Sequence, residues 1–447
     1  MRVLPAARFL GVIIALTCVL AIVPTVPAQK KMDRIEKDRM KSMLKNIKNA
    51  VKKDYYDPNF HGIDIEERFA TAEKRLGEVE TVGQSFGAIA QVLMDFNDSH
   101  LYFLPPPTNV DIEYGWRANM FGDKCLVRLV KPNSDAEAKG LKVGDQILSI
   151  EGFRPTRKEW WKVMYFYNQF GKRARLRLSV LSPGADSPRD IEIDSKIKQR
   201  PKVINRNLLY QLFDTTGKDE YDYNYFKNIG NIAIWKMPTF GIDPASIDVF
   251  VSKVKDSKSL ILDLRGNGGG LVATLERLAG YMFDKDLTIA ELKGRKQMDP
   301  QKSKTRGKEA YAGNLIVLVD GNSGSAAEIF ARLVQLEKRG KVLGDVSSGS
   351  VMQSRQEIMS TGANDEVVYG ASVTNADVIM SDGKSLEHVG VVPDETIVPS
   401  GADLANQKDP VLARAIELLG GIVSADDAGK FFRYVWREDD RIEIDVK

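Results

Sequence analysis

One stretch, residues 317–331, constrains the fold of this chain more than any other. It begins as an apolar run typical of a buried strand, breaks at a polar turn with glycines, and continues with apolar residues three and four apart, which indicates a helix. A strand that turns directly into a helix places Ser325 at the helix N-terminus, where free backbone N–H groups favour an anion. The stretch therefore predicts either a nucleophilic serine beside an oxyanion-binding amide, or a serine that only caps the helix.

A second strand-like run, residues 259–264, ends in the series Arg-Gly-Asn-Gly-Gly-Gly at 265–270. Consecutive glycines permit positive φ angles and let the backbone approach a ligand closely. A phosphate-binding loop is the main rival, but the Gly-Lys-Ser/Thr ending of that motif is missing. Two glycine-rich strand ends, one of which carries a serine, fit an oxyanion hole better than a nucleotide site.

The order of four motifs resembles the carboxyl-terminal processing (tail-specific) proteases, the S41 serine peptidases. The motifs are Asp263 to Gly270, Gly324 to Ile329, Gly344-Asp345 and Gly390 to Asp394, and the likeness runs from about residue 40 to about residue 420. The resemblance implies an α/β catalytic core of the ClpP/crotonase type. It also implies Ser325 as nucleophile, with an oxyanion hole made by the amides of Ala326 and Gly269, which we favour over Gly268.

The general base departs from the pattern of the processing proteases. Their lysine position is occupied here by Ser350, and a serine hydroxyl is not a base near neutral pH. The other branch, which resembles the tricorn core protease, uses a serine, a histidine and a carboxylate. That likeness implies His100 as base, with Ser99 and Glu387 orienting and polarising it.

Each of these roles has a plainer alternative. His100 is otherwise a hydrogen-bonded core histidine, and Glu387 a solvated surface acid. A lysine from elsewhere, such as Lys384, is the alternative base.

Residues 111–197 are patterned as a separate unit of short strands that resembles a PDZ domain. The resemblance places Tyr114, Gly115, Trp116 and Arg117 at the carboxylate-binding loop. Such a loop offers successive N–H groups to a C-terminal carboxylate while the peptide adds a strand to the neighbouring sheet edge. The alternative is a lid or spacer that binds no peptide.

The chain begins with a targeting segment. Arg2 and Arg8 flank the start of an apolar run that ends in small residues. This pattern predicts a signal peptide over 1–28, cleaved after Ala28, and therefore a periplasmic or secreted protein. A lipoprotein anchor at Cys18 is a weaker alternative. Cleavage leaves Cys125 as the single thiol and lowers the formal charge from +3 to +1, because the segment carries two arginines. A near-neutral charge argues against nucleic acid or an anionic membrane as partner.

The remaining chain divides into an N-terminal helical region (29–110), the PDZ-like unit, the catalytic core (205–400), and a C-terminal helix and tail (401–447). Three scattered histidines and one thiol do not build a zinc site, and no cofactor is implied. We expect an exported serine endopeptidase that cleaves protein or peptide substrates recognised by their C-termini. The alternatives are an inactive peptide-binding protein of the same fold and a Ser/Lys protease with a displaced lysine. The sequence leaves the oligomeric state open.

Overall fold

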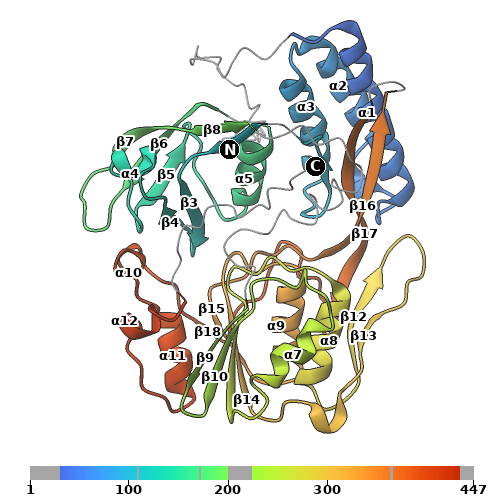
Figure 1. Cartoon of the computed structure of the whole chain (residues 1–447). Coiled ribbons are helices and arrows are strands. Elements are labelled where there is room, and N and C mark those ends of the chain that lie inside the picture. Colours follow the sequence, from blue (N-terminus) through green and yellow to red (C-terminus); the bar gives the residue numbers. More distant parts are fainter. Residues whose placement is uncertain (1–30, 108–109, 171–172, 200–223, 363–365, 433–447) are drawn as a thin grey trace, which may run out of the picture.

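The computed structural model describes residues 31–107, 110–170, 173–199, 224–362 and 366–432. Figure 1 shows an α/β core in the lower half, a β-rich unit at the upper left, and a helical region at the upper right. The predicted signal peptide lies outside the described residues, as does the end of the predicted tail. Within the described residues, no helix has the length and apolar character that a membrane span needs.

The core is built on a six-stranded sheet with the order β18-β15-β14-β11-β10-β9. Neighbouring strands run parallel except β9, which is antiparallel to β10. The strands are β9 (Tyr225–Ile229), β10 (Ile232–Lys236), β11 (Ser259–Asp263), β14 (Asn314–Val319), β15 (Lys341–Gly344) and β18 (Glu395–Thr396). The central strands are almost wholly buried, as parallel strands covered on both faces are.

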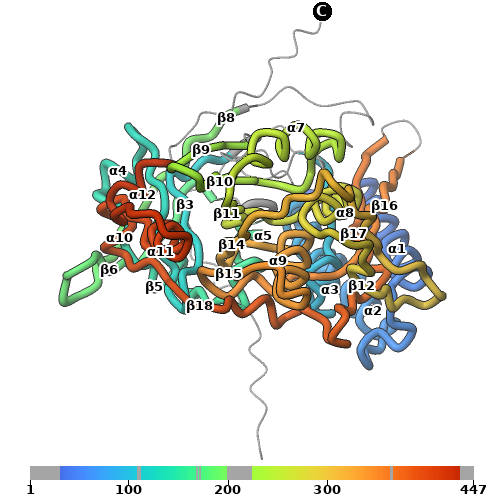
Figure 2. Tube along the Cα trace, turned by 90° about the horizontal axis from the view of Figure 1, so that it is seen from below, coloured from blue at the N-terminus to red at the C-terminus, as the bar shows by residue number. Residues whose placement is uncertain are grey.

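Alternate side chains of these strands enter two different cores, because successive residues of a strand point to opposite faces. Leu260 and Leu262 join the core under α7 (Ser246–Ser252), α8 (Val272–Met282) and α9 (Ala326–Leu336). Ile261, between them, joins the core under α11 (Pro410–Leu418) and α12 (Ala425–Ala428). Figure 2 shows α11 and α9 on opposite sides of the sheet. The C-terminal helix is therefore the third layer of the core and not an appendage to it.

A second sheet joins the core to the helices. Its order is β1-β17-β12-β13, with β16 paired to β17. The strands are β1 (Tyr102–Leu104), β12 (Leu287–Lys293), β13 (Gln301–Ser303), β16 (Met352–Thr361) and β17 (Val367–Met380). The long β16–β17 hairpin rises beside α1 (Arg34–Asp54), α2 (Ile65–Glu78) and α3 (Val82–Met94) (Figure 1). Tyr369 and Val373 of β17 are buried in the same core as these helices, so the helical region packs on the hairpin.

The β-rich unit is a five-stranded antiparallel sheet with the order β3-β4-β5-β6-β7. Its strands are β3 (Trp116–Phe121), β4 (Lys124–Val130), β5 (Gln146–Ile150), β6 (Arg175–Leu181) and β7 (Arg189–Asp194), with helices α4 (Asp135–Ala138) and α5 (Trp160–Gln169). A separate pair, β2 (Val110–Glu113) and β8 (Lys196–Gln199), brings together the two ends of the unit. The helix α10 (Gly401–Ala405) approaches it so closely that a Cβ on Gly144 would lie 2.2 Å from the Gly401 carbonyl oxygen.

Candidate active site

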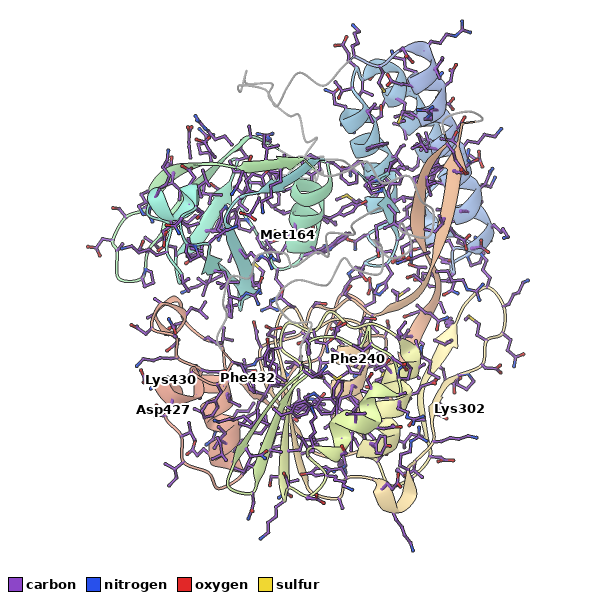
Figure 3. The ribbon with its side chains drawn as sticks, in the orientation of Figure 1. Met164, Phe240, Lys302, Asp427, Lys430 and Phe432 are labelled. Carbon is purple, nitrogen blue, oxygen red and sulfur yellow. The ribbon has the colours of Figure 1, made fainter. Side chains whose placement is uncertain are left out.

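The candidate site lies where the parallel strands of the core end. The carboxyl ends of parallel strands meet at one edge of a sheet, which is the usual place for a site in such folds. Here the loops after β10, β11, β14 and β15 meet at that edge. Figure 3 labels Phe240, from the loop after β10, at the end of the core that faces the other two parts. Its N–H donates to the carbonyl of Gly269 in the next loop, at 2.8 Å.

Ser325 stands between β14 and α9 in a strained backbone conformation. Its φ is 50° and its ψ is −118°. A positive φ is uncommon outside glycine, and such strain costs about 1–3 kcal/mol, so it persists only where the surrounding contacts impose it. The imposed turn holds the half-buried Ser325 at the N-terminus of α9, where the first N–H groups lack helical partners.

The glycine-rich loop lies directly against Ser325. A Cβ added to Gly269 would be 2.6 Å from the Cβ of Ser325 and 3.0 Å from the amide nitrogen of Ala326. The φ of Gly269 is 101°, so both space and backbone conformation require glycine there. The two glycine-rich strand ends that the sequence singled out are therefore in contact.

The backbone amides near Ser325 differ in whether they already donate a hydrogen bond. Gly269 N–H donates to the side-chain oxygen of Asn267 at 2.9 Å. Within the part of the chain that the structure describes, the amides of Gly268 and Ala326 have no hydrogen-bond acceptor. Ala326 N–H is therefore available to an oxyanion, and Gly269 N–H has a competing partner.

Ser323, two residues before Ser325, is excluded as a nucleophile by its contacts. It is completely buried. Its hydroxyl donates to the carbonyl of Leu264 and accepts from the N–H of Asp320, both at 2.9 Å. It joins the ends of β11 and β14 and does not face the solvent.

A chain of hydrogen bonds fixes the proton of His100. Ser99 Oγ donates its single hydrogen to Glu387 Oε2 at 2.9 Å, so it can only accept at His100 Nδ1, 2.8 Å away. Nδ1 therefore carries the imidazole hydrogen of neutral His100, and Nε2 keeps a lone pair. Nε2 has no hydrogen-bond partner within the described residues. This is the tautomer that a general base needs.

We call the hydrogen-bonded chain of Glu387, Ser99 and His100 the relay. Burial changes the pKa of the residues at both of its ends. It lowers the pKa of His100, against the opposing charge of Asp98, and raises that of Glu387. Glu387 nevertheless accepts two backbone hydrogen bonds, from Ser99 N–H at 2.9 Å and Val351 N–H at 2.8 Å, which favour its ionised form. The relay is thus a neutral histidine linked through a hydroxyl to a partly buried carboxylate.

The relay and the nucleophile meet through one segment, residues 350–351. The carbonyl of Ser350 accepts the N–H of Ser325 at 2.9 Å, while the next amide, Val351, holds Glu387. The hydroxyl of Ser325 and the imidazole of His100 make no hydrogen bond with each other in this structure. Such contacts are often long before substrate binds.

Residues 228–397 match the family model described as peptidase family S41. The chain is 25% identical over 359 residues to a carboxyl-terminal-processing protease of a Picosynechococcus species, with 76% of this chain and 80% of the relative covered. It is 25% identical over 277 residues to the tail-specific protease of Haemophilus influenzae, covering 58% of this chain but 38% of that longer relative.

Residues 228–397 are thus similar to peptidase family S41, and the chain is similar to carboxyl-terminal-processing proteases.

These matches support a serine-type peptidase. Solved structures share its fold. Mature CPAF has a TM-score of 0.62 at 12% identity, covering 83% of this chain and 94% of that one. The photosystem II D1 C-terminal processing protease has a TM-score of 0.51 at 20% identity, covering 80% and 93%.

The loop that the resemblance assigns to peptide carboxylates precedes an edge strand. Tyr114 and Gly115 lie just before β3, and among the strands that the structure describes β3 pairs only with β4. The Tyr114 hydroxyl accepts the N–H of Arg173 at 3.0 Å. Trp116 and Arg117 begin β3 itself.

Arg157 joins the β-rich unit to the catalytic loops. Its guanidinium donates to the carbonyl of Gly122, in the β3–β4 turn, at 2.9 Å and to the carbonyl of Val346 at 2.8 Å, and it also pairs with the Asp345 carboxylate. Asp345 and Val346 begin the loop that ends at Ser350. No pattern in the sequence indicates this contact.

Other features of this peptidase lie away from the nucleophile. A cavity of about 270 Å³ opens in the β-rich unit between Cys125, Ile147 and Arg154. Lys384 is exposed in the turn after β17. Over the described residues, no group of three or more histidine, cysteine or acidic side chains is placed to hold a metal ion.

Two carboxylates near the site were not assigned a role from the sequence. Asp98 is buried, and its Oδ1 accepts the N–H of His100 at 2.8 Å and the hydroxyl of Thr374 at 2.7 Å. Glu328 is buried beneath Ser325. Each lies within three residues of a predicted site residue, and that proximity was the available signal.

Proposed function

We propose that this protein is an exported serine endopeptidase with Ser325 as nucleophile and His100 as general base. The hydrogen-bond direction through Ser99 carries the proposal, because it leaves His100 Nε2 unprotonated. Glu387 orients Ser99 and favours the positive charge that His100 acquires.

The reaction is acyl transfer. Ser325 Oγ attacks the scissile carbonyl carbon as its proton moves to His100 Nε2. The tetrahedral intermediate collapses when His100 returns the proton to the leaving amine. Water then attacks the acyl-enzyme by the same route, releasing the acid and restoring Ser325. No metal or cofactor is required for these steps.

The oxyanion is held by the amides of Ala326 and Gly269. Ala326 N–H needs no rearrangement, since it has no acceptor in the described part of the chain. Gly269 lies against Ser325, and its N–H exchanges Asn267 for the oxyanion when substrate binds. Gly268, whose amide is unengaged among the described residues, is the alternative donor.

Substrate selection is assigned to the PDZ-like unit. Tyr114, Gly115, Trp116 and Arg117 would receive the C-terminal carboxylate of a protein or peptide, whose chain adds to the open edge of β3. The edge position of β3 supports this assignment. Export, with cleavage after Ala28, completes the proposal.

Hydrolysis of fluorescein-labelled, denatured casein by residues 29–447 tests the function. The wild-type chain should release fluorescent peptides, and both Ser325→Ala and His100→Ala should lose at least about a thousandfold in kcat/KM. A control, Ser252→Ala, changes a hydroxyl that bonds only within α7 and should retain full activity.

A catalytically inactive peptide-binding protein is the second candidate. The missing hydrogen bond between Ser325 and His100, together with Ser350 in the lysine position, favours it. It predicts no hydrolysis by the wild type together with retained peptide binding. A base at Lys384 is disfavoured, because this lysine is exposed in the turn after β17, whereas a general base must lie within hydrogen-bond reach of the proton that it takes.

A further inference from the structure

Glu328, in the first turn of α9, gathers hydrogen-bond donors from two segments of the candidate site. Its side chain is completely buried. The donors, with their distances to the carboxylate, are Ser347 Oγ at 2.6 Å and Gly349 N at 2.7 Å on Oε1, and Ser350 N at 2.9 Å, Ser325 N at 3.0 Å and Ser348 Oγ at 3.3 Å on Oε2. One carboxylate thus joins the nucleophile to the loop after β15.

The arrangement is specific for a carboxylate. Each oxygen faces at least one backbone N–H, and a backbone N–H cannot turn to become an acceptor. Burial raises the pKa of Glu328 to about 7, while these donors favour its ionised form. An amide of the same shape would place its own N–H group against a backbone N–H.

The loop that Glu328 holds also carries the relay. Ser350 accepts the N–H of Ser325, and the following amide, Val351, donates to Glu387. Ser347 and Ser348 supply hydroxyls to Glu328 in the same loop where Ser350 occupies the family's lysine position. A shift of this loop would therefore move the nucleophile and the carboxylate of the relay relative to each other.

We propose that Glu328 is a positioning residue for the peptidase reaction: its carboxylate holds residues 347–350 in one conformation and so fixes the position of Ser325 relative to Glu387, Ser99 and His100. The inference rests on the proposed function. Glu328 acts through the loop and does not touch substrate.

Glu328→Gln in residues 29–447 tests this role with labelled, denatured casein as substrate. We expect kcat to fall about a hundredfold, the cost of a displacement of about 1 Å in a reacting group, with KM within about threefold. Glu337→Gln is the matched control, because the same change at the other end of α9 removes only a surface pair with Lys285. It should keep the wild-type kcat.

Two further variants make the test decisive. Glu328→Asp keeps the charge and should recover part of the lost kcat, which a purely steric role of the side chain would not give. If Glu328→Gln does not fold by circular dichroism, Ser347→Ala, which removes the shortest donor, decides instead, with an expected loss in kcat of at least about tenfold.

A folded Glu328→Gln variant, or Ser347→Ala in its place, with the wild-type kcat overturns the inference and leaves the proposed function intact. A wild-type chain that hydrolyses nothing overturns the proposed function itself, and this inference with it.

Discussion

At the scale of single residues, the hydroxyl of Ser99 decides what His100 can do. It has one hydrogen, and that hydrogen goes to Glu387. Ser99→Ala should therefore lower kcat by about tenfold to a hundredfold, because Nδ1 loses its fixed acceptor and the imidazole loses its preferred tautomer and orientation. Steady-state kinetics on the labelled casein measure this change in kcat. An unchanged kcat would mean that Glu387 does not contribute to the reaction through Ser99.

The pH dependence of kcat/KM identifies the base. Burial lowers the pKa of His100 from its ordinary value near 6.5, so its neutral, basic form persists below pH 6.5. The kcat/KM should rise with pH through that lowered pKa, and His100→Ala should abolish this rise. A profile that rises only above pH 8 would indicate a lysine. Glu328→Gln removes the ionisation of the Glu328 carboxyl group near pH 7 and leaves the rise in kcat/KM that is due to His100 in place.

At the scale of elements, the first turn of α9 contains the carboxyl group of Glu328, whose charged form is disfavoured by burial. The folded-state pKa of Glu328, about 7, lies above its ordinary value of 4.5. The folded protein then binds the proton more tightly than the unfolded chain, so this contribution to stability is full below pH 4.5 and is lost as the pH rises through 7. Urea unfolding should show a free energy that falls more between pH 5 and pH 8 in the wild type than in Glu328→Gln. Equal slopes would contradict the raised pKa.

The elements also show how far the sequence predicts the site. The strand-turn-helix around Ser325 and the glycine series at 265–270 were predictable, because local periodicity and glycine chemistry define both. The contact of Asn267 with Gly269 N–H was not, since the sequence does not reveal which loop amide a side chain will occupy. Glu328 was recognised only as part of a motif, because four of its donors come from a loop about twenty residues away in sequence.

At the scale of the whole molecule, the β-rich unit and the core share one contact network. Arg157 bridges the β3–β4 turn and the loop at Asp345. Gly122 of that turn also donates its N–H to Asp345, which is 223 residues away in the chain. Local patterns carry no information about such a pairing. The C-terminal segment was predicted as a helix and tail, but local periodicity did not reveal that its helix α11 forms a layer of the core.

Recognition of C-termini is a property of the whole molecule, since it requires the PDZ-like unit and the core together. A peptide with a free apolar C-terminus should be cleaved at least about tenfold faster, in kcat/KM, than the same peptide amidated, because charge-assisted hydrogen bonds contribute about 1.5–3 kcal/mol. Equal rates on the two peptides would reduce the unit to a structural spacer.

The central claim is that Ser325 is a nucleophile activated by His100. A fluorophosphonate probe, followed by tryptic mass spectrometry, tests it most directly, because the probe bonds only to an activated serine. We expect a single adduct on Ser325 in the wild type, none in Ser325→Ala, and labelling at least about a hundredfold slower in His100→Ala. An adduct on another serine, or equal labelling of Ser325 with and without His100, would contradict it.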